Sequence, residues 1–231
     1  MAKQSPVAVL ISAGAEWRSV LPLFPQAEIQ TSPFSTWFEA PVDGQPVIFL
    51  HGGWGKIAAA ASAQYIIDRW QPRLLVNLGT CGGFTGEIER GEIILVERTL
   101  VYDIIEKMSD PRLAIARFTT DLDLSWLEGD LPLPVRRGLL VSADRDLLME
   151  DITRLKTEYG AVAGDWESGA IAWVAARNHT PCLILRGVSD LVSEESGEAY
   201  GDYGLFAQRT GEIMPRLVAS LPGWLKKLPQ V

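Results

Sequence analysis

The sequence predicts an α/β fold, a three-layer α/β/α sandwich around a central mixed sheet. Continuous apolar runs, which are typical of strands buried on both faces, alternate along the chain with segments of helical periodicity. Of the 231 residues, 47% are hydrophobic and 22% are charged, as in ordinary globular proteins. This length suffices for one α/β domain with a sizeable core, so we expect a single domain over residues 1–231.

Each expected element follows from a local pattern. Buried apolar runs predict strands at residues 7–11, 74–78, 92–97, 137–142 and 181–188. A hairpin is expected between residues 36–40 and 47–51, because Asp43-Gly44 is typical of a two-residue turn. Helical spacing predicts helices at residues 15–24, 56–70, 148–159, 165–178 and 203–221. Residues 102–130 are polar and irregular, which suits an excursion near an active site or an interface loop, and residues 194–204 suit a mobile acidic loop.

Composition excludes several classes of function. The net charge is −8 and the basic residues are scattered, which argues against a nucleic-acid partner. The short apolar run near the N-terminus is read as a first strand rather than a signal peptide, and no run has membrane-spanning length. Cys81 and Cys182 are the only cysteines, which fits a reducing compartment and predicts a cytoplasmic protein. Without CxxC, HExxH, Walker or GxGxxG motifs, we expect neither a metal nor a cofactor.

Small or polar residues follow four of the expected strands, at residues 12–14, 79–83, 142–146 and 189–190. Ligands of open α/β sheets bind outside the carboxyl ends of the strands, so this recurrence predicts a site at one rim. The plainer interpretation is that Gly, Ser and Asp make turns there. The glycine stretches at residues 52–55 and 79–83 are expected to be loops whose amides can approach an anion or a sugar.

Four carboxylates are the sharper candidates. Asp165 is expected to cap the helix at residues 165–178, and Glu167 in its first turn suits adjacent sugar hydroxyls. Asp190 follows an apolar strand, where partial burial would raise its pKa enough for it to donate a proton. For Asp190 and for Glu16 the alternative is a plain acid at a turn or in a first helical turn.

Four segments together resemble a known family: GGWGKIAAAASAQYIIDRWQPRLLVNLGTCGG, RGLLVSADRDLL, AGDWESGAIAWVA and LRGVSD. In this order they resemble the nucleoside phosphorylase/nucleosidase superfamily, and within it the methylthioadenosine/S-adenosylhomocysteine nucleosidases. The resemblance covers about residues 7–190. It implies a phosphorylase-type sandwich that forms a homodimer or higher homo-oligomer. It also implies cleavage of the N-glycosidic bond of a small purine nucleoside through a transition state with positive charge on the sugar.

The resemblance also implies roles for individual residues. Asp190 resembles the acid that protonates the purine at N7, and Ser189 and Arg186 resemble the residues that place it. Glu16 resembles the acid that activates the attacking water, and Glu167 resembles the acceptor of the ribose hydroxyls. The family's loop beside the sugar and the nucleophile corresponds to Thr80, Cys81 and Gly82.

The chain departs from the family where the base and the sugar would pack. Trp166 stands where the family often has Met under the sugar. Asp146, beside Leu147 in the segment expected to contact the substrate, stands near the position of an aromatic residue that packs on adenine. An acid at this position is compatible with a different base.

Three functions remain open at this stage. Phosphorolysis requires cationic groups around the nucleophile, and the phosphorylase pattern has arginine where this chain has Asn77, which leaves Arg18 as a possible substitute. We therefore expect hydrolysis, with a purine nucleoside phosphorylase as the alternative. A non-catalytic nucleoside-binding protein of the same fold is the third possibility. The presence of Glu16, Glu167 and Asp190 argues against it.

Overall fold

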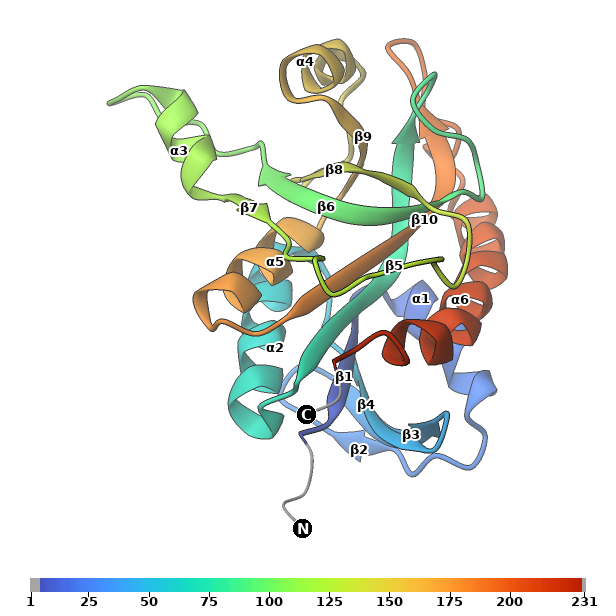
Figure 1. Ribbon diagram of the computed structural model, residues 1–231. Helices are drawn as coiled ribbons and strands as arrows, with labels where there is room; N and C mark the ends of the chain where they lie inside the picture. Colours follow the sequence, from blue (N-terminus) through green and yellow to red (C-terminus); the bar gives the residue numbers. More distant parts are fainter. Residues whose placement is uncertain (1–4, 230–231) are drawn as a thin grey trace.

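The computed structural model describes residues 5–229, in which ten strands form one mixed sheet flanked by helices (Figure 1). The strands are β1 (Val7–Ile11), β2 (Gln30–Thr31), β3 (Thr36–Val42), β4 (Gln45–His51), β5 (Leu74–Phe84), β6 (Ile93–Val101), β7 (Thr119–Asp121), β8 (Arg136–Ser142), β9 (Ala161–Asp165) and β10 (Cys182–Val192). The helices are α1 (Gly14–Val20), α2 (Gly55–Trp70), α3 (Pro111–Arg117), α4 (Met149–Tyr159), α5 (Ser168–Arg177) and α6 (Tyr203–Leu225), with a 3₁₀ turn at Leu21–Leu23. The predicted α/β/α architecture with a mixed sheet is confirmed.

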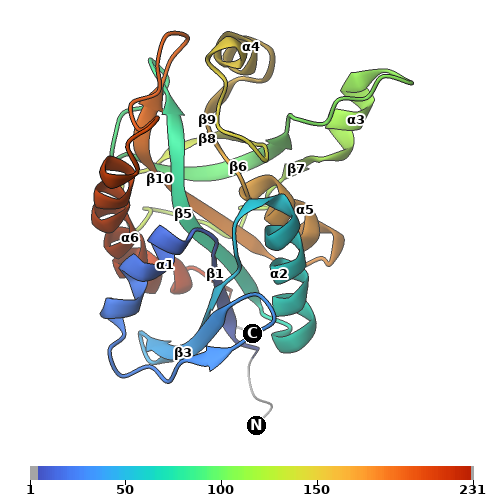
Figure 2. The ribbon, with the colours of Figure 1, turned by 180° about the vertical axis from the view of Figure 1, so that it is seen from behind.

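The two faces of the sheet bury different side chains, as the alternation along a strand requires. On β1, Val7 and Val9 pack in the core layer that faces α1 and α6, whereas Ala8 and Leu10 pack in the layer that faces α2 and α5. Figures 1 and 2 show these helix pairs on opposite sides of the sheet. None of the helices within residues 5–229 is long and apolar enough to cross a lipid bilayer.

Part of the sheet closes on itself, which a flat sandwich would not do. β5 pairs with β1, β9 and β10, and β10 also pairs with β6, which continues through β8 back to β9. The strands β5, β10, β6, β8 and β9 therefore form a closed ring at one end of the molecule. Closure brings the carboxyl ends of β5, β8, β9 and β10 toward one space, with the N-terminus of α5 beside them.

The glycines at residues 79–83 lie within β5 and do not form the expected loop. A Cβ at Gly79 would lie 2.0 Å from the Arg186 guanidinium, and one at Gly83 would lie 2.7 Å from side chains of Ile88 and Val188. These glycines let neighbouring side chains approach the curved strand. Gly53 does lie in a loop, whereas Gly55 is the first residue of α2, and both have the positive φ that favours glycine.

Three other elements differ from expectation. Residues 102–130 contain α3 and β7, which are short and mostly exposed and therefore lack a clear apolar period. The strand β9 was not predicted: of its five residues only Asp165 was assigned, and it was assigned to the helix that follows. β10 runs on through Ser189 and Asp190, with a register irregularity between Val188 and Asp190, so these residues belong to a bulged strand and not to a loop after it.

The packing of β10 against α6 gives a test of this fold. A Cβ at Gly187 would lie 2.2 Å from Cγ2 of Ile213 in α6, so Gly187→Ala should lower the free energy of unfolding by about 1–3 kcal/mol in urea denaturation. Gly211 on the exposed side of α6 has no atom within 4 Å of the same position. Gly211→Ala should therefore stabilise the helix by up to about 1 kcal/mol. A Gly187→Ala protein as stable as the parent would contradict this packing.

Candidate active site

A cavity of about 660 Å³ opens where the closed ring meets α1, α5 and α6. Ten of the eleven predicted site residues line it: Glu16, Thr80, Cys81, Gly82, Asp146, Leu147, Trp166, Glu167, Ser189 and Asp190. The eleventh, Arg186, is 1% exposed and is not among the residues that line the cavity. The strand ends that were predicted to share one rim of the sheet therefore contribute to one cavity.

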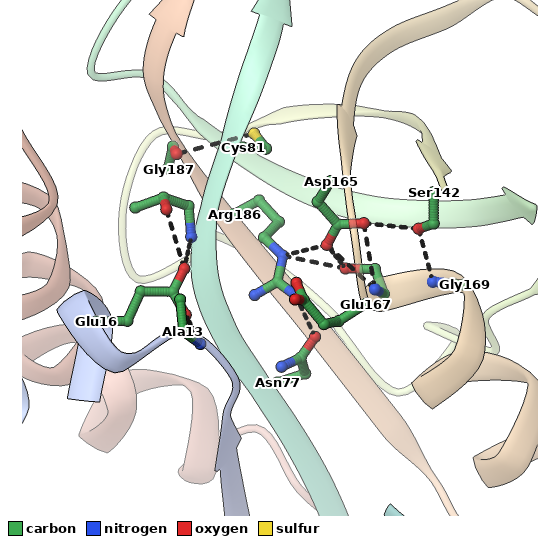
Figure 3. A network of polar contacts seen from close by, with 12 residues as sticks. Ala13, Glu16, Asn77, Cys81, Ser142, Asp165, Glu167, Gly169, Arg186 and Gly187 are labelled. Carbon is green, nitrogen blue, oxygen red and sulfur yellow. Dashed lines mark hydrogen bonds and ion pairs between the residues drawn. The ribbon is translucent and has the colours of Figure 1, made fainter. Parts of the chain in front are cut away.

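Arg186 on β10 is the centre of the buried polar network in Figure 3. Its Nε donates to Oδ2 of Asp165 at 2.8 Å, and its Nη2 donates to Oδ1 of Asn77 at 2.7 Å. Asn77 is itself fully buried and donates to the Leu10 carbonyl oxygen at 2.9 Å. The resemblance implied that Arg186 helps to place Asp190. In the structure its hydrogen bonds instead join β10 to β5 and β9. Its third nitrogen, Nη1, is buried without a hydrogen-bond partner among the described residues.

Asp165 caps α5 as expected, and it also makes contacts that were not expected. It is the last residue of β9, and its carboxylate does accept from the Ser168 amide at the start of α5. The same carboxylate also forms the buried ion pair with Arg186 and accepts from the Ser142 hydroxyl at 2.6 Å. Both ends of the ion pair are almost completely shielded from solvent, so removal of one partner would leave an uncompensated charge.

Glu16 on α1 enters the site from the opposite side of β5 (Figure 3). Its Oε1 accepts from the Thr80 amide at 2.6 Å and lies 2.9 Å from the Thr80 hydroxyl, while Oε2 accepts from the Ala13 amide at 3.0 Å. A Cβ at Gly79 would lie 2.8 Å from Glu16 Oε1 and 2.0 Å from Arg186 Nη1. The glycine therefore leaves the carboxylate and the unpartnered donor close together.

Glu167 is held by the N-terminus of α2. It is the N-cap residue of α5, but its side chain reaches across to accept from the Gly55 amide at 3.0 Å. The next amide, that of Lys56, donates to Oδ1 of Asp144 at 2.7 Å. Both amides belong to the first turn of α2, and the anions that they meet are carboxylates of the protein itself. Burial first, and then the nearby charge of Asp165, raises the pKa of Glu167 to about 8.

Asp190 lies on the bulged part of β10, about 7% exposed, with its side chain at the cavity. The Ser189 hydroxyl lies 2.6 Å from its Oδ1 and donates to it. Burial raises the pKa of Asp190, and the hydrogen bond from Ser189 and the charge of Arg209 oppose that rise without cancelling it. Asp190 is thus better suited than an exposed aspartate to carry a proton near neutral pH.

The wall beside Asp190 comes from two segments far apart in sequence. Leu147 precedes α4, and its carbonyl oxygen accepts from the hydroxyl of Tyr200 in the loop before α6. Asp146 is exposed to the cavity next to them, and its charge contributes to the raised pKa of both Tyr200 and Asp190. Tyr200 was not predicted as a site residue, because a single tyrosine in an acidic loop carries no periodic or motif signal.

Two tryptophans form a further wall on the side of Glu167. Trp54 and Trp166 stack with ring centroids 4.5 Å apart and an angle of 27° between their planes. Trp54 remains 66% exposed, so one face is available to the cavity. Within residues 5–229, His, Cys, Asp and Glu form no cluster suited to hold a metal ion.

Comparison with known proteins assigns the chain to a family. The model of the phosphorylase superfamily matches residues 20–221. A 5′-methylthioadenosine/S-adenosylhomocysteine nucleosidase of Haemophilus influenzae strain PittEE is 31% identical over 165 residues, 66% of this chain and 72% of that protein. One of Oceanobacillus iheyensis is 26% identical over 187 residues, 76% and 80% of the two chains. The structure of the Neisseria meningitidis nucleosidase in complex with methylthio-immucillin-A superposes with a TM-score of 0.77 at 21% identity, covering 97% of this chain and all of that one.

The raised pKa of Glu167 makes stability depend on pH. Because folding raises this pKa from 4.5 to about 8, the folded state favours the protonated carboxyl, and stability falls as the pH rises through that interval. Glu167→Gln removes the ionisable group but retains the acceptor for the Gly55 amide. From pH 5 to pH 8, the variant should gain stability relative to the parent by on the order of 3 kcal/mol in urea denaturation. Glu150→Gln, on the exposed side of α4, is the matched control. An unchanged pH dependence in Glu167→Gln would rule out this environment for the carboxyl.

Proposed function

Because this chain belongs to the phosphorylase superfamily, we propose that it is a purine nucleosidase that hydrolyses the N-glycosidic bond of a 5′-modified nucleoside. The relatives named above make 5′-methylthioadenosine and S-adenosylhomocysteine the first candidate substrates. The observation that carries the proposal is the arrangement of Asp190, Glu16 and Glu167 on three walls of one cavity. A nucleosidase needs one group to protonate the departing base, one to direct water and one to hold the sugar.

Asp190 is assigned to the departing base. Cleavage of the glycosidic bond leaves a negative charge on the purine, and a proton delivered to N7 neutralises that charge. Burial raises the pKa of Asp190, which favours the protonated form relative to that of an exposed aspartate, and the Ser189 hydroxyl donates to Oδ1 of the carboxyl. Leu147 and Tyr200 form the neighbouring wall. We therefore assign the base to this end of the cavity.

Glu16 and Arg186 are assigned to the attacking water. The buried Nη1 of Arg186 is a hydrogen-bond donor that lacks a partner within the described residues, and a water beside it would satisfy it. The same water would donate to Glu16, whose carboxylate lies over Gly79 next to that nitrogen. As the water attacks the anomeric carbon, Glu16 takes up its proton, and the bond to the base breaks with its electron pair on the purine.

Glu167 is assigned to the ribose hydroxyls. Its Oε1 already accepts from Gly55, and the other oxygen is available for a hydroxyl donor of the sugar. Trp166, directly before it in sequence, lines the same cavity and presents an apolar surface for one face of the ribose. The positive charge that develops on the sugar lowers the cost of ionising Glu167, so the carboxylate form becomes more favourable in the transition state than in the empty site.

Hydrolysis is favoured over phosphorolysis by the charges of the site. Glu16, Asp165 and Glu167 surround one arginine, and that arginine is already paired with Asp165. A phosphate dianion beside the sugar would face two further carboxylates. Asn77, where the phosphorylase pattern has arginine, is buried and orients Arg186 instead of facing the cavity.

We also propose that the protein is a homo-oligomer in the cytoplasm. Apolar side chains near the start of α2 and in the segment after β6 are exposed: Ile57 by 85%, Ile105 by 74% and Met108 by 94%. The ion pair of Lys56 with Asp103 joins these two segments, so a second copy could cover them together. Both cysteines are free thiols, which suits a reducing compartment, and cell fractionation would test that location.

The activity is tested by product analysis in phosphate-free buffer. Incubation with 5′-methylthioadenosine or S-adenosylhomocysteine should release the free base and the free 5′-modified ribose, detected by chromatography. Added phosphate should neither be required nor produce a ribose 1-phosphate. Strict dependence on phosphate would establish the phosphorylase alternative, and absence of cleavage across a panel of purine nucleosides would overturn the proposal.

The role of Asp190 is tested with Asp190→Asn in the same assay. The amide cannot deliver the proton, so kcat should fall at least about 100-fold while a nucleoside analogue still binds in calorimetry. Asp202→Asn is the matched control, because Asp202 is another acid of the cavity wall and asparagine can keep its role as the N-cap of α6. Equal rates for Asp190→Asn and the parent would refute the assignment, and binding without turnover in the parent would favour the non-catalytic alternative.

The oligomer is tested by sedimentation velocity. Ile57→Glu combined with Ile105→Glu places two charges in the proposed interface and should shift the protein toward the monomer. Ile29→Glu, at a residue 50% exposed in a different part of the chain, should leave the mass unchanged. A parent protein that sediments as a monomer at micromolar concentration would contradict the proposal.

A further inference from the structure

Glu16, the residue assigned to the attacking water, lies on a helix that cannot fix its own position. The helix α1 has only seven residues, and helices of this length are marginal without tertiary contacts. Its N-cap residue is Ala13, whose side chain has no acceptor for the free amides of the first turn. The position of Glu16 therefore depends on contacts from outside α1.

The direction of the Glu16 carboxylate depends on two separate parts of the backbone. The Ala13 amide donates to Oε2 at 3.0 Å, and the Thr80 amide of β5 donates to Oε1 at 2.6 Å. The first donor belongs to the link between β1 and α1, whereas the second belongs to the sheet. A shift of this link relative to β5 would draw the two donors apart. The carboxylate is thus sensitive to the backbone at Ser12 and Ala13.

The imidazole of His51 contacts this link and the residue after Glu16 at the same time. His51 is the last residue of β4, which pairs in parallel with β1. Its Nε2 lies 3.1 Å from the carbonyl oxygen of Ser12. Its ring stacks on Trp17, with ring centroids 5.5 Å apart and 8° between the planes. Because Ser12 precedes Ala13 and Trp17 follows Glu16, the imidazole holds the turn that carries the carboxylate on both sides.

The partners of His51 define one protonation state of the ring. A carbonyl oxygen only accepts, so the hydrogen bond to Ser12 requires a proton on Nε2. Nδ1 lies 2.8 Å from the Ser35 hydroxyl and accepts from it in the neutral ring. Burial lowers the pKa of His51, the hydrogen bond to the Ser12 carbonyl opposes this change, and the charge of Arg18 adds to it. The ring is therefore neutral near pH 7, with its proton on the nitrogen that faces Ser12.

We propose that His51 is a positioning residue for Glu16. Its hydrogen bond to Ser12 and its stacking on Trp17 hold the turn in place, so that the Ala13 amide stays on the carboxylate. This inference rests on the proposed function, in which Glu16 takes up the proton of the attacking water. His51 is not among the residues that line the cavity, so it acts on the substrate only through Glu16. A displaced catalytic group lowers the rate more than it weakens binding.

The test separates the hydrogen bond of His51 from its stacking, with 5′-methylthioadenosine as the substrate. His51→Phe keeps an aromatic ring against Trp17 but offers no donor to the Ser12 carbonyl. Its kcat should fall about 10-fold, the effect of one neutral hydrogen bond, and its KM should change by less than about twofold. His51→Gln should recover kcat to within about threefold of the parent, since its amide nitrogen can replace Nε2. His179→Phe, in the loop at the end of β10 away from Asp190, is the matched control and should behave as the parent.

Two further measurements distinguish positioning from a general loss of structure. The acidic limb of the pH profile of kcat reports the group that must be deprotonated. This limb should move to higher pH in His51→Phe, because the Ala13 amide stabilises the Glu16 carboxylate. In a Glu16→Gln background, His51→Phe should lower the residual rate no further, since a positioning residue acts only through the group that it places.

Ser35→Ala is the milder variant, and it keeps the test possible where His51→Phe does not fold. It removes the hydroxyl on Nδ1 but retains the backbone groups through which residue 35 bonds to Ser32. The ring can then carry its proton on Nδ1 and lose the bond to Ser12, so kcat should fall about threefold.

Kinetics like those of the parent in both His51→Phe and Ser35→Ala would overturn the inference while the proposed function stands. An equal loss of rate from His51→Phe with and without Glu16→Gln would lead to the same conclusion, because His51 would then not act through Glu16. If the parent cleaves no purine nucleoside, the proposed function fails and this inference fails with it.

Discussion

The buried ion pair between Arg186 and Asp165 is the interaction on which the rest of the site depends. A guanidinium with 1% exposure is tolerated only where acceptors are already in place, and here Asp165 and Asn77 supply them from two different strands. The pair therefore fixes the positions of β5, β9 and β10 relative to one another. The positive charge of Arg186 also interacts with Glu16 and Glu167. Both carboxylates raise the pKa of this arginine, as Asp165 does.

Closure of the sheet turns these strand contacts into a cavity. The strand β5 is long enough to pair with β1 at its start and with β9 at its end, and β10 runs beside it for its whole length. Gly79 keeps the crossing open for Arg186 and Glu16, where any side chain would collide with both. The irregularity at Ser189 interrupts the alternation of β10, so that consecutive residues Ser189 and Asp190 both contribute to the same wall.

The two acids of the cavity with raised pKa values, Asp190 and Glu167, lie in different surroundings. Burial raises the pKa of Asp190 and of Glu167, but Asp190 is next to the wall formed with Tyr200, whereas Glu167 is tied to Gly55 and lies near Arg186. A substrate that binds between them meets a proton donor at one end and hydrogen-bond acceptors at the other. Two guanidinium groups, those of Arg18 and Arg145, line this otherwise acidic cavity, and that of Arg145 is paired with Asp151.

The sequence by itself determined the fold class, most strands and helices, and the set of carboxylates, because apolar periodicity and turn residues act locally and the family resemblance covers most of the chain. It could not show that residues 79–83 and 189–190 continue their strands, since glycines and a serine-aspartate pair are also typical of turns. Only the tertiary structure decided that Asp165 is the counter-ion of Arg186 and that Tyr200 and Arg18 reach the cavity. Those contacts join residues that are distant along the chain, and the closure of the sheet, which no local pattern encodes, brings them together.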